Sequence, residues 1–456
     1  MTSVTQDVLH VYEAVHQALE AGQPKQAVAL LERLHPADQA EVFRRLPSRD
    51  QVLLLRTMDV ENAAELLEEL HEQEAAEVAD DLSPERLADI LDEMDPEDAA
   101  DLLGDLPQDL VQEILEEMEE AEDVEPLLQY PDDTAGGLMT TEYVALHQEA
   151  TVRETIAALR AFVAEEIEIP YYLFVVDEQN HLVGVVDIRD LITAMPQVRI
   201  RDIMDPNVIS VHVLTDQEEV AHIMKKYELA VLPVVDDEKR LVGIISYEDV
   251  LHVLSEEAVE DILHLGAVES APLLEKPYWR QHLGEVVRSR LPWLLLLFVA
   301  ATFTSTVIGY FESFLARVIV LSRFIPLLIG TGGNVGGQTV ATLIRALVLR
   351  EVTPRDVLRV WLREVRIAAL LGVALGSVAL VGTLLWGMDY HVSLTVAFTM
   401  TAIVLWASSV ATFVPLAATA VNIDPTHVSG PLMSTLIDVT GLLIYFLVAQ
   451  AIIPQL

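Results

Sequence analysis

Residues 83–106 read SPERLADILDEMDPEDAADLLGDL, which is two consecutive copies of a 12-residue unit. Each copy opens with Ser-Pro or Asp-Pro, a helix N-cap followed by proline at the first helical position, and this pair starts a new helix. A continuous helix would turn by about 1200° over 12 residues and drift by ~120° per unit. It could not keep the repeated apolar residue on one face, so the pattern predicts short helices joined by tight turns.

The same period extends outward from this stretch over residues 35–118, and a leucine or methionine closes every unit. We therefore predict an all-α, superhelical domain of about seven short helices within residues 1–130, each burying its apolar face against its neighbours. The repeated apolar residues are Leu34, Leu46, Met58, Leu70, Leu82, Met94, Leu106 and Met118.

The charge is distributed unevenly along the chain. Residues 1–130 hold 35 acidic and 7 basic side chains, residues 131–280 hold 29 and 11, and residues 281–456 hold 8 and 10. Most charge runs are solvated helix faces. At this density, however, the carboxylates repel one another unless a cation is supplied, and divalent cations with oxygen ligands are natural candidates.

Composition also argues against several function classes. No region offers the basic surface that phosphate contacts need, so nucleic acid is not an expected partner. The chain of 456 residues has no cysteine, which excludes disulfides, thiolate metal sites and cysteine nucleophiles. The first 20 residues lack the pattern of a cleavable signal peptide, so we expect the first 280 residues to stay in the cytoplasm.

A second internal repeat is of mixed type. IPYYLFVVDEQNHLVGVVDIRDLI (169–192) aligns without gaps on ELAVLPVVDDEKRLVGIISYEDVL (228–251). Each copy reads as a strand, a charged turn, a strand with a glycine, and a helix that begins near Asp190 or Asp249. The pattern resembles a tandem CBS-domain pair, an α/β module known for binding adenine nucleotides or metal ions, and we assign it to residues 131–254.

The resemblance implies a nucleotide site in the first copy. In that family the aspartate that opens the final helix holds a ribose, a position taken here by Asp190 and Asp249. Arg189 would then meet phosphate and Tyr172 would stack on adenine, which makes ATP a candidate regulatory ligand. The structural alternative is that both aspartates only cap helices.

Residues 255–285 are predicted to form a linker helix. Glu257, Glu260 and Asp261 fall on one side of it at spacings of three and four, where like charges repel. This face is either simply solvated or a metal-dependent linker that leads into the membrane.

The last part of the chain, residues 286–456, reads as a transmembrane domain with five helices. Arginines precede the first span and lie between the second and third, so the positive-inside rule places those ends in the cytoplasm, together with the N-terminal domains. We expect a multi-pass protein of the inner cell membrane. The predicted spans are 291–310, 316–349, 362–387, 392–420 and 428–453.

Two polar features interrupt these spans. IPLLIGTGGNVGGQTVATL (325–343) holds five glycines with Asn334 and Gln338, which favours a broken helix that lines an ion path; the alternative is that the glycines permit close helix packing. Asp438 lies inside the last span, where an ionised acid is costly and therefore marks a functional site.

PLLIGTGGNVGGQ (326–338) and PLMSTLIDVTGLLIY (431–445) resemble the MgtE family of magnesium channels, and the order of acidic helical repeat, CBS pair and pore completes the likeness. The resemblance implies a homodimer with its pore at the interface and a main Mg²⁺ site at Asp438. We place Ser434 at the same site and Gly330 and Asn334 along the route. One departure is Gly430, where the family often has asparagine.

We therefore predict a Mg²⁺-selective channel or transporter for magnesium uptake, which cytosolic Mg²⁺ closes by bridging acids of the helical repeat, the CBS pair and the linker. Mg²⁺ is then both substrate and regulatory ligand. The candidate regulatory ligands are Glu97, Asp98, Asp216, Glu218, Glu228, Asp249, Glu257, Glu260 and Asp261.

Two other functions were weighed. A gradient-driven secondary transporter of another divalent cation would use Glu364, near the cytosolic end of the third span, as a proton site. A membrane-bound enzyme is disfavoured because the sequence offers no nucleophile–base constellation, no P-loop and no metal-ligand histidine pair; most histidines are expected at the surface.

Overall fold

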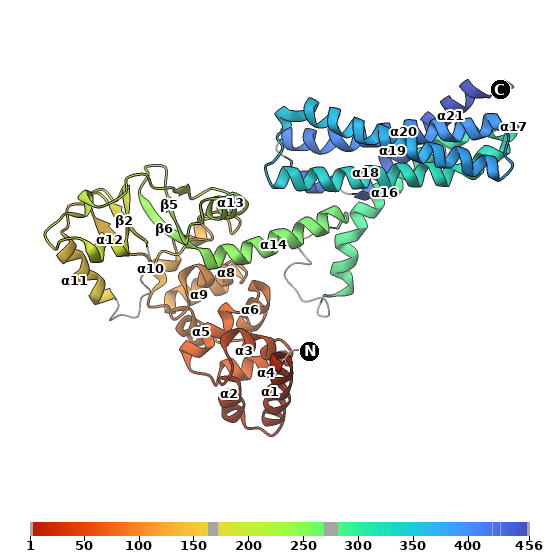
Figure 1. Cartoon of the computed structure of the whole chain (residues 1–456). Helices are drawn as coiled ribbons and strands as arrows, with labels where there is room; N and C mark the ends of the chain where they lie inside the picture. Colours follow the sequence, from red (N-terminus) through yellow and green to blue (C-terminus); the bar gives the residue numbers. More distant parts are fainter. Residues whose placement is uncertain (1–2, 163–171, 269–280, 422, 429, 454–456) are drawn as a thin grey trace. The chain divides into compact units, whose positions relative to one another are not determined.

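The computed structural model describes residues 3–162, 172–268, 281–421, 423–428 and 430–453. It divides into two units, Met1–Glu257 and Ala258–Leu456, each of which is described by itself (Figure 1). The first unit contains short helices followed by two small sheets, and the second contains long apolar helices. The multidomain layout predicted from the sequence is confirmed.

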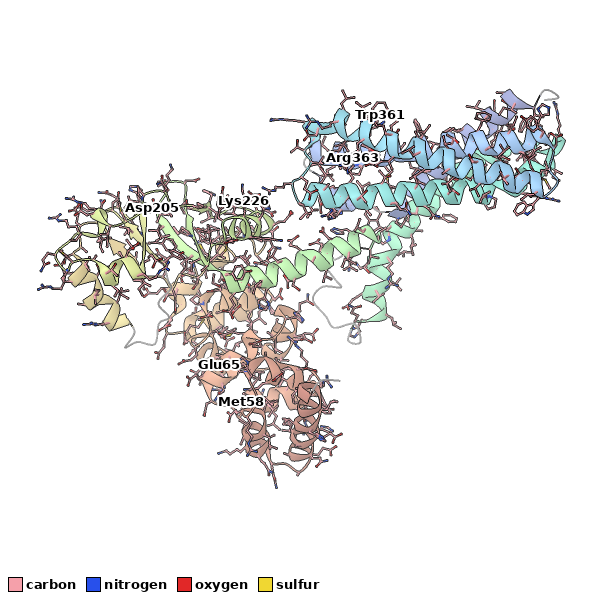
Figure 2. The ribbon with its side chains drawn as sticks, viewed as in Figure 1. Met58, Glu65, Asp205, Lys226, Trp361 and Arg363 are labelled. Atoms are coloured by element: carbon pink, nitrogen blue, oxygen red, sulfur yellow. The ribbon has the colours of Figure 1, made fainter. Side chains whose placement is uncertain are left out.

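The N-terminal helices after the α1–α2 pair stack in two rows, because each contacts the helix two places along the chain. Contacts join α3 to α5, α5 to α7 and α7 to α9, and likewise α2 to α4, α4 to α6 and α6 to α8. Met58 is 4% exposed and the α5 residue Glu65 is exposed, so these two labelled side chains in Figure 2 mark the core and the solvated surface. The elements are α1 (Ser3–Glu20), α2 (Pro24–Leu31), α3 (Pro36–Phe43), α4 (Ser48–Leu55), α5 (Val60–Glu68), α6 (Glu72–Ala79), α7 (Pro84–Leu91), α8 (Pro96–Gly104), α9 (Gln108–Glu117), α10 (Ala121–Val124) and η1 (Leu127–Gln129).

Side chains tie some helices to the ends of others, both within a row and between the rows. The Arg44 guanidinium donates to the Glu69 carbonyl at 2.6 Å, at the carboxyl end of α5. At the amino end of α8, the Glu68 carboxylate accepts from the Asp95 backbone N–H at 2.9 Å. Cations at carboxyl ends and carboxylates at amino ends satisfy the unpaired backbone groups and complement the helix dipoles.

The two halves of the CBS region have the same sheet. β1 (Ala145–His147) pairs in parallel with β2 (Tyr172–Val176), which pairs antiparallel with β3 (Leu182–Asp187). β4 (Val211–His212), β5 (Val231–Val235) and β6 (Leu241–Ser246) repeat this order.

The glycine in the last strand of each sheet, β3 and β6, has a packing reason. A Cβ on Gly184 would lie 2.5 Å from the Met204 sulfur, and one on Gly243 would lie 2.6 Å from the Met139 sulfur. Each methionine thus fills the space that a side chain would need.

The final helices of the two halves differ in length. α12 (Ile188–Thr193) stops just before Pro196, and a proline disfavours helical backbone at the residue that precedes it. α14 (Tyr247–Leu265) meets no proline and runs for 19 residues. The remaining elements of this region are α11 (Val152–Phe162), η3 (Ile200–Asp202) and α13 (Gln217–Tyr227).

The second unit has five helices, among the described residues, that are long and apolar enough to cross a membrane. Helix α20 packs against α18, α19 and α21 and contributes many of the buried side chains. The long helices are α16 (Leu283–Tyr310), α18 (Ile325–Val348), α19 (Val357–Leu385), α20 (Tyr390–Ala420) and α21 (Gly430–Ile452), with the short elements α17 (Glu312–Arg317), η4 (Ile319–Phe324), η5 (Pro354–Asp356) and η6 (Pro425–His427) between them.

Trp361 and Arg363, both labelled in Figure 2, lie near the start of α19. The indole N–H of Trp361 donates to the Ser409 hydroxyl of α20 at 3.1 Å, whereas Arg363 is exposed. The two residues mark the packed and the open side of this helix end.

The prediction of a broken helix over residues 325–343 is wrong. α18 is continuous through all five glycines, so its backbone groups are satisfied within the helix. Tertiary packing explains why glycine stands at these positions. A Cβ on Gly332 would lie 2.7 Å from Ile403 Cγ2, and one on Gly336 would lie 2.2 Å from Ile437 Cδ1. The glycines let α20 and α21 approach closely, which is the alternative the sequence left open.

Candidate functional site

Asp438 lies in α21 and is half-buried. Its Oδ1 atom is buried and has no hydrogen-bond partner among the residues that the structure describes. Ser434 is one turn earlier on the same helix, and its hydroxyl lies 2.6 Å from where a Cβ on Gly333 would stand. The predicted pore residues thus come from two neighbouring helices, α18 and α21.

The facing helix α18 carries a polar stripe. Gly330, Asn334 and Gln338 are spaced by four residues, so they share one face, and all three are exposed in the single chain. No atom lies within 4 Å of the Cβ position of Gly330. Two polar side chains, Asn334 and Gln338, thus lie on an exposed face of a helix long enough to cross a membrane.

Acids of the helical repeat gather around the start of α8. Carboxylate oxygens of Glu68, Asp95 and Asp98 lie within 4.8 Å of one another. Burial, reinforced by the charge of Asp95, raises the pKa of Glu68 to about 7 although a hydrogen bond from the Asp95 backbone opposes it. Burial also raises the pKa of Glu97 to about 9, with the charges of Asp95 and Asp249 adding to the effect.

Asp249, from α14, belongs to the same electrostatic neighbourhood. Burial and the charge of Asp95 raise its pKa above the ordinary value, against hydrogen bonds from Ser246. Asp249 thus acts electrostatically on the predicted acid Glu97, while the predicted acid Asp98 lies with Glu68 and Asp95, two residues that the sequence did not single out. A regular spacing points to these two residues. Glu68 precedes Asp95 by 27 residues, and the Asp92 carboxylate accepts from the Glu119 backbone N–H across the same spacing.

A second acidic group forms where α13 begins. Asp216 caps α13 by accepting from the Glu218 backbone at 2.9 Å. Between them, Gln217 Nε2 donates to Glu257 Oε1 at 2.8 Å, which brings α14 to this helix end. Glu228 does not join the group, because it closes the far end of α13 in a left-handed conformation with φ of 54°.

The linker acids sit on the later turns of α14. Glu260 Oε1 lies 3.5 Å from Nε2 of His264, and Asp261 is half-buried. The His264 and His427 ring centroids are 4.2 Å apart and His264 is only 9% exposed, a juxtaposition of two histidines that the sequence did not predict.

The predicted nucleotide residues cluster at the first sheet. Tyr172 pairs with Asp187 in the β2–β3 register and is 37% exposed. The Arg189 guanidinium donates to Asp187 at 2.5 Å and holds the pKa of that carboxyl at about 2. Arg189 is therefore engaged by an acid at the place where a phosphate would bind.

The two candidate aspartates of the CBS pair behave differently. Asp187, and not Asp190, caps α12, since its carboxylate accepts from the Arg189 backbone at 2.8 Å. Asp190 is exposed on the first turn. Asp249 instead accepts from the Ser246 backbone N–H at 2.9 Å. This contact is the helix-capping role that the sequence offered as the alternative to ribose binding.

Comparison with known proteins shows matches along the chain. Residues 325–448 match a divalent cation transporter family named MgtE, residues 34–133 match the MgtE intracellular N domain, and residues 135–197 and 200–256 match CBS domains. The chain is 44% identical over 333 residues to the magnesium transporter MgtE of Thermus thermophilus, covering 73% of this chain and 72% of that protein.

The magnesium transporter MgtE of Bacillus subtilis is 34% identical over 341 residues, which is 75% of this chain and 74% of that protein. Among solved structures, the cytosolic domain of the Mg²⁺ channel MgtE in complex with ATP is 40% identical, covers 53% of this chain and 99% of that chain, and has a TM-score of 0.49. The curated relatives are named transporters, in agreement with the prediction that the chain is not an enzyme.

Proposed function

Because this chain belongs to the MgtE family of magnesium transporters, we propose that it is a Mg²⁺-selective channel for magnesium uptake in the inner cell membrane, and that cytosolic Mg²⁺ closes it. The observation that carries the proposal is Asp438, a half-buried carboxylate within a helix long enough to span a membrane. An ionised acid at that depth costs at least a few kcal/mol, and a residue retained at such a cost marks a functional site.

The carboxylate suits a hydrated ion. Mg²⁺ prefers six oxygens in octahedral geometry and gives up water reluctantly, so a pore acid holds it largely through its waters. Asp438 Oδ1 has no hydrogen bond from the described part of the protein, which leaves it available for such water. A ring of carboxylates concentrates divalent over monovalent cations.

We place the pore between two copies of the chain. The stripe of Gly330, Asn334 and Gln338 is exposed in one chain, yet polar groups at membrane depth must be covered by protein or line a wet cavity. A homodimer in which the two stripes face each other provides that cavity. It also brings together two Asp438 carboxylates, with Ser434 one turn away on each copy.

The gate is proposed to lie in the cytosolic acids. Residues 1–280 carry 64 acidic and 18 basic side chains, and burial, with added repulsion from neighbouring acids, raises the pKa values of Glu68, Glu97 and Asp249. Bridging Mg²⁺ would replace this repulsion by attraction. To shift the closed fraction from 1:99 to 99:1, the ions need about 5.5 kcal/mol of preference for the closed state, which several weak sites together can supply.

The regulatory ions are proposed to bind at two groups in the first unit and at the linker. The first group holds Glu97, Asp98 and Asp249, the second holds Asp216, Glu218 and Glu257, and Glu260 and Asp261 follow on α14. Glu228 stands apart from both groups and is the weakest of the candidates.

ATP is proposed as a further regulator, bound at the first CBS sheet. Tyr172 offers an exposed ring, Asp190 an exposed carboxylate for ribose, and Arg189 a cation for phosphate. Because Arg189 pairs with Asp187, ATP has to displace that ion pair when it binds.

The test is Mg²⁺ uptake by the purified chain in liposomes, driven by an inward Mg²⁺ gradient without a proton or sodium gradient. Wild type should conduct, whereas Asp438→Asn should weaken ion binding by at least ~1.4 kcal/mol, or about tenfold in apparent affinity. Glu364→Gln is the matched control within a membrane helix. Flux that is unchanged in Asp438→Asn, or that needs a proton gradient and Glu364, would refute the channel.

A further inference from the structure

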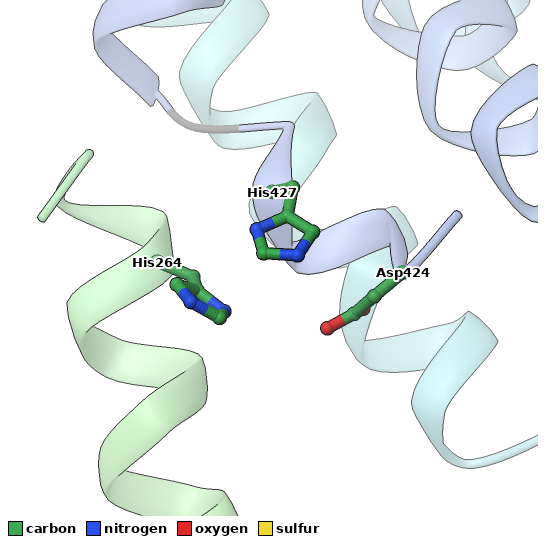
Figure 3. A group of neighbouring side chains, drawn as sticks. All are labelled: His264, Asp424 and His427. Atoms are coloured by element: carbon green, nitrogen blue, oxygen red, sulfur yellow. The ribbon is translucent and has the colours of Figure 1, made fainter. Parts of the chain in front are cut away.

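Two histidines and an aspartate meet beside the loop that leads into α21. His264 lies in the last turn of α14, Asp424 is the N-cap of the short helix η6, and His427 is the last residue of η6. All three belong to the unit of residues 258–456. Donor atoms from each, one per residue, lie within 4.8 Å of one another, and Figure 3 shows the two imidazoles and the carboxylate directed toward a common space.

Hydrogen bonds fix the loop side of this group. Asp424 caps η6: its Oδ1 accepts from the Thr426 backbone at 2.9 Å and its Oδ2 accepts from the Thr426 hydroxyl at 2.5 Å. Thr426 is buried, and its hydroxyl oxygen lies 3.5 Å from Nδ1 of His264. The carboxylate is thereby oriented before any ligand binds.

Apolar packing fixes the helix side. Leu265, next to His264, packs against a cluster that includes the buried residues Val428 and Met433. The Leu265 carbonyl lies 3.9 Å from the Cβ position of Gly430, at the start of α21. The end of α14 is thus seated on the entry to the last helix through contacts that need no ion.

A carboxylate of the same helix also lies next to the His264 ring. Glu260 Oε1 lies 3.5 Å from its Nε2 atom, which leaves Nδ1 on the side of Thr426 and η6. Metal-binding histidines commonly make such a contact with their second ring nitrogen, because it fixes the tautomer and the ring orientation.

The donor set decides which ion fits. Mg²⁺ favours oxygen ligands only, whereas imidazole favours Zn²⁺, Co²⁺ and Ni²⁺. Metal–nitrogen bonds of about 2.0–2.1 Å in a tetrahedron place the donors ~3.3 Å apart, so the group has to close by at most about 1.5 Å. His427 is exposed, and its side chain can make this movement.

We propose that His264, Asp424 and His427 form a binding site for a borderline transition-metal dication such as Zn²⁺ or Co²⁺, with Glu260 positioning His264. The three ligands differ from those of the proposed Mg²⁺ sites, and only Glu260, which is also a proposed regulatory acid of the linker, belongs to both groups. A bound ion would cross-link the end of α14 to the loop between α20 and α21.

The experiment is a Co²⁺ titration of the full chain in detergent, free of any purification tag, with millimolar Mg²⁺ present throughout. We expect one Co²⁺ per chain at this site, with the visible absorption bands of a tetrahedral complex, and displacement of that Co²⁺ by Zn²⁺. Absence of these bands, or their removal by excess Mg²⁺, would overturn the proposal.

Variants then assign the ligands. His427→Ala changes an exposed side chain, and Asp424→Asn keeps a cap for η6 while it removes the charge, so both should fold. Each should weaken Co²⁺ binding at least about tenfold, and Glu260→Gln about tenfold. His391→Ala, at an exposed histidine at the start of α20, is the matched control and should bind as wild type does.

Unchanged Co²⁺ affinity in both His427→Ala and Asp424→Asn contradicts the assignment. Asp438→Asn, which tests the pore, should leave the Co²⁺ spectrum intact. A failure of the channel proposal can therefore be told apart from a failure of this one.

Discussion

Glu97 shows how strongly a single acid can depend on its surroundings. Burial and the nearby charges of Asp95 and Asp249 raise its pKa from 4.5 to about 9. Between these two pH values the folded chain binds a proton that the unfolded chain has released. The free energy of unfolding therefore falls as pH rises through this window. Glu68, whose pKa is about 7, acts in the same direction over the lower part of it.

We predict that thermal unfolding of the full chain in detergent without Mg²⁺ occurs at progressively lower temperature from about pH 5 to about pH 9. Saturating Mg²⁺ should flatten this slope, because the ion replaces the proton as the partner of these carboxylates. Glu97→Gln should also reduce the slope. The exposed residue Glu113 of α9 supplies the control Glu113→Gln, which should leave the slope unchanged. An equal effect of both variants would count against a special role of Glu97.

Asp187 and Arg189 lead to a second prediction at this scale. Asp187→Asn keeps an N-cap for α12 and releases the Arg189 guanidinium, so ATP should bind more tightly than to wild type. Arg189→Ala should weaken ATP binding by about 1.5–3 kcal/mol, the usual value of a hydrogen bond to a charged group. Calorimetric titration of both variants with ATP provides the measurement. If both variants change the ATP affinity in the same direction, Asp187 and ATP do not compete for Arg189.

At the scale of elements, the pairing of α19 with α20 depends on two glycines. A Cβ on Gly376 would lie 2.8 Å from the Ala397 carbonyl oxygen, and one on Gly372 would lie 3.2 Å from Thr401 Cα. The Thr401 hydroxyl donates to the Gly372 carbonyl at 2.9 Å across this contact. Since the obstacles include backbone atoms as well as the Thr401 side chain, a change of rotamer cannot remove all of them.

Gly376→Ala should destabilise the membrane unit by about 1–3 kcal/mol, the usual cost of overpacking. Gly382→Ala, on the same helix with no atom within 4 Å of its Cβ position, should be neutral or slightly stabilising because alanine favours helix. Thermal unfolding in detergent compares the two, and similar shifts in both variants would contradict the packing argument.

The helices and strands could be predicted from the sequence where the sequence pattern was periodic. The 12-residue unit and the 59-residue shift between the CBS halves both appear in the structure, the latter as equivalent pairs Val175–Gly184 and Val234–Gly243. The continuity of α18 was missed because glycine and proline report local preference, whereas contacts with Ile403 and Ile437 decide the outcome. The His264 group was missed because its members are about 160 residues apart and share no repeat.

At the scale of the whole molecule, the acidic excess predicts a response to Mg²⁺. Carboxylates that repel one another in the absence of divalent cations should make residues 1–280 easier to open locally. Limited proteolysis of the full chain should therefore slow in millimolar Mg²⁺. A sodium salt at matched ionic strength is the control, since screening acts on all charges alike. Identical cleavage patterns in both salts would refute ion-bridged closure.

The two rows of the helical domain restrict how its length can change during evolution. Each helix contacts the helix two places away, so duplication of one 12-residue unit would move every later helix into the opposite row and reverse the face it offers to the CBS pair. Duplication of two units would restore the original assignment. Insertions and deletions tolerated by this domain should therefore come in multiples of 24 residues, one unit for each row.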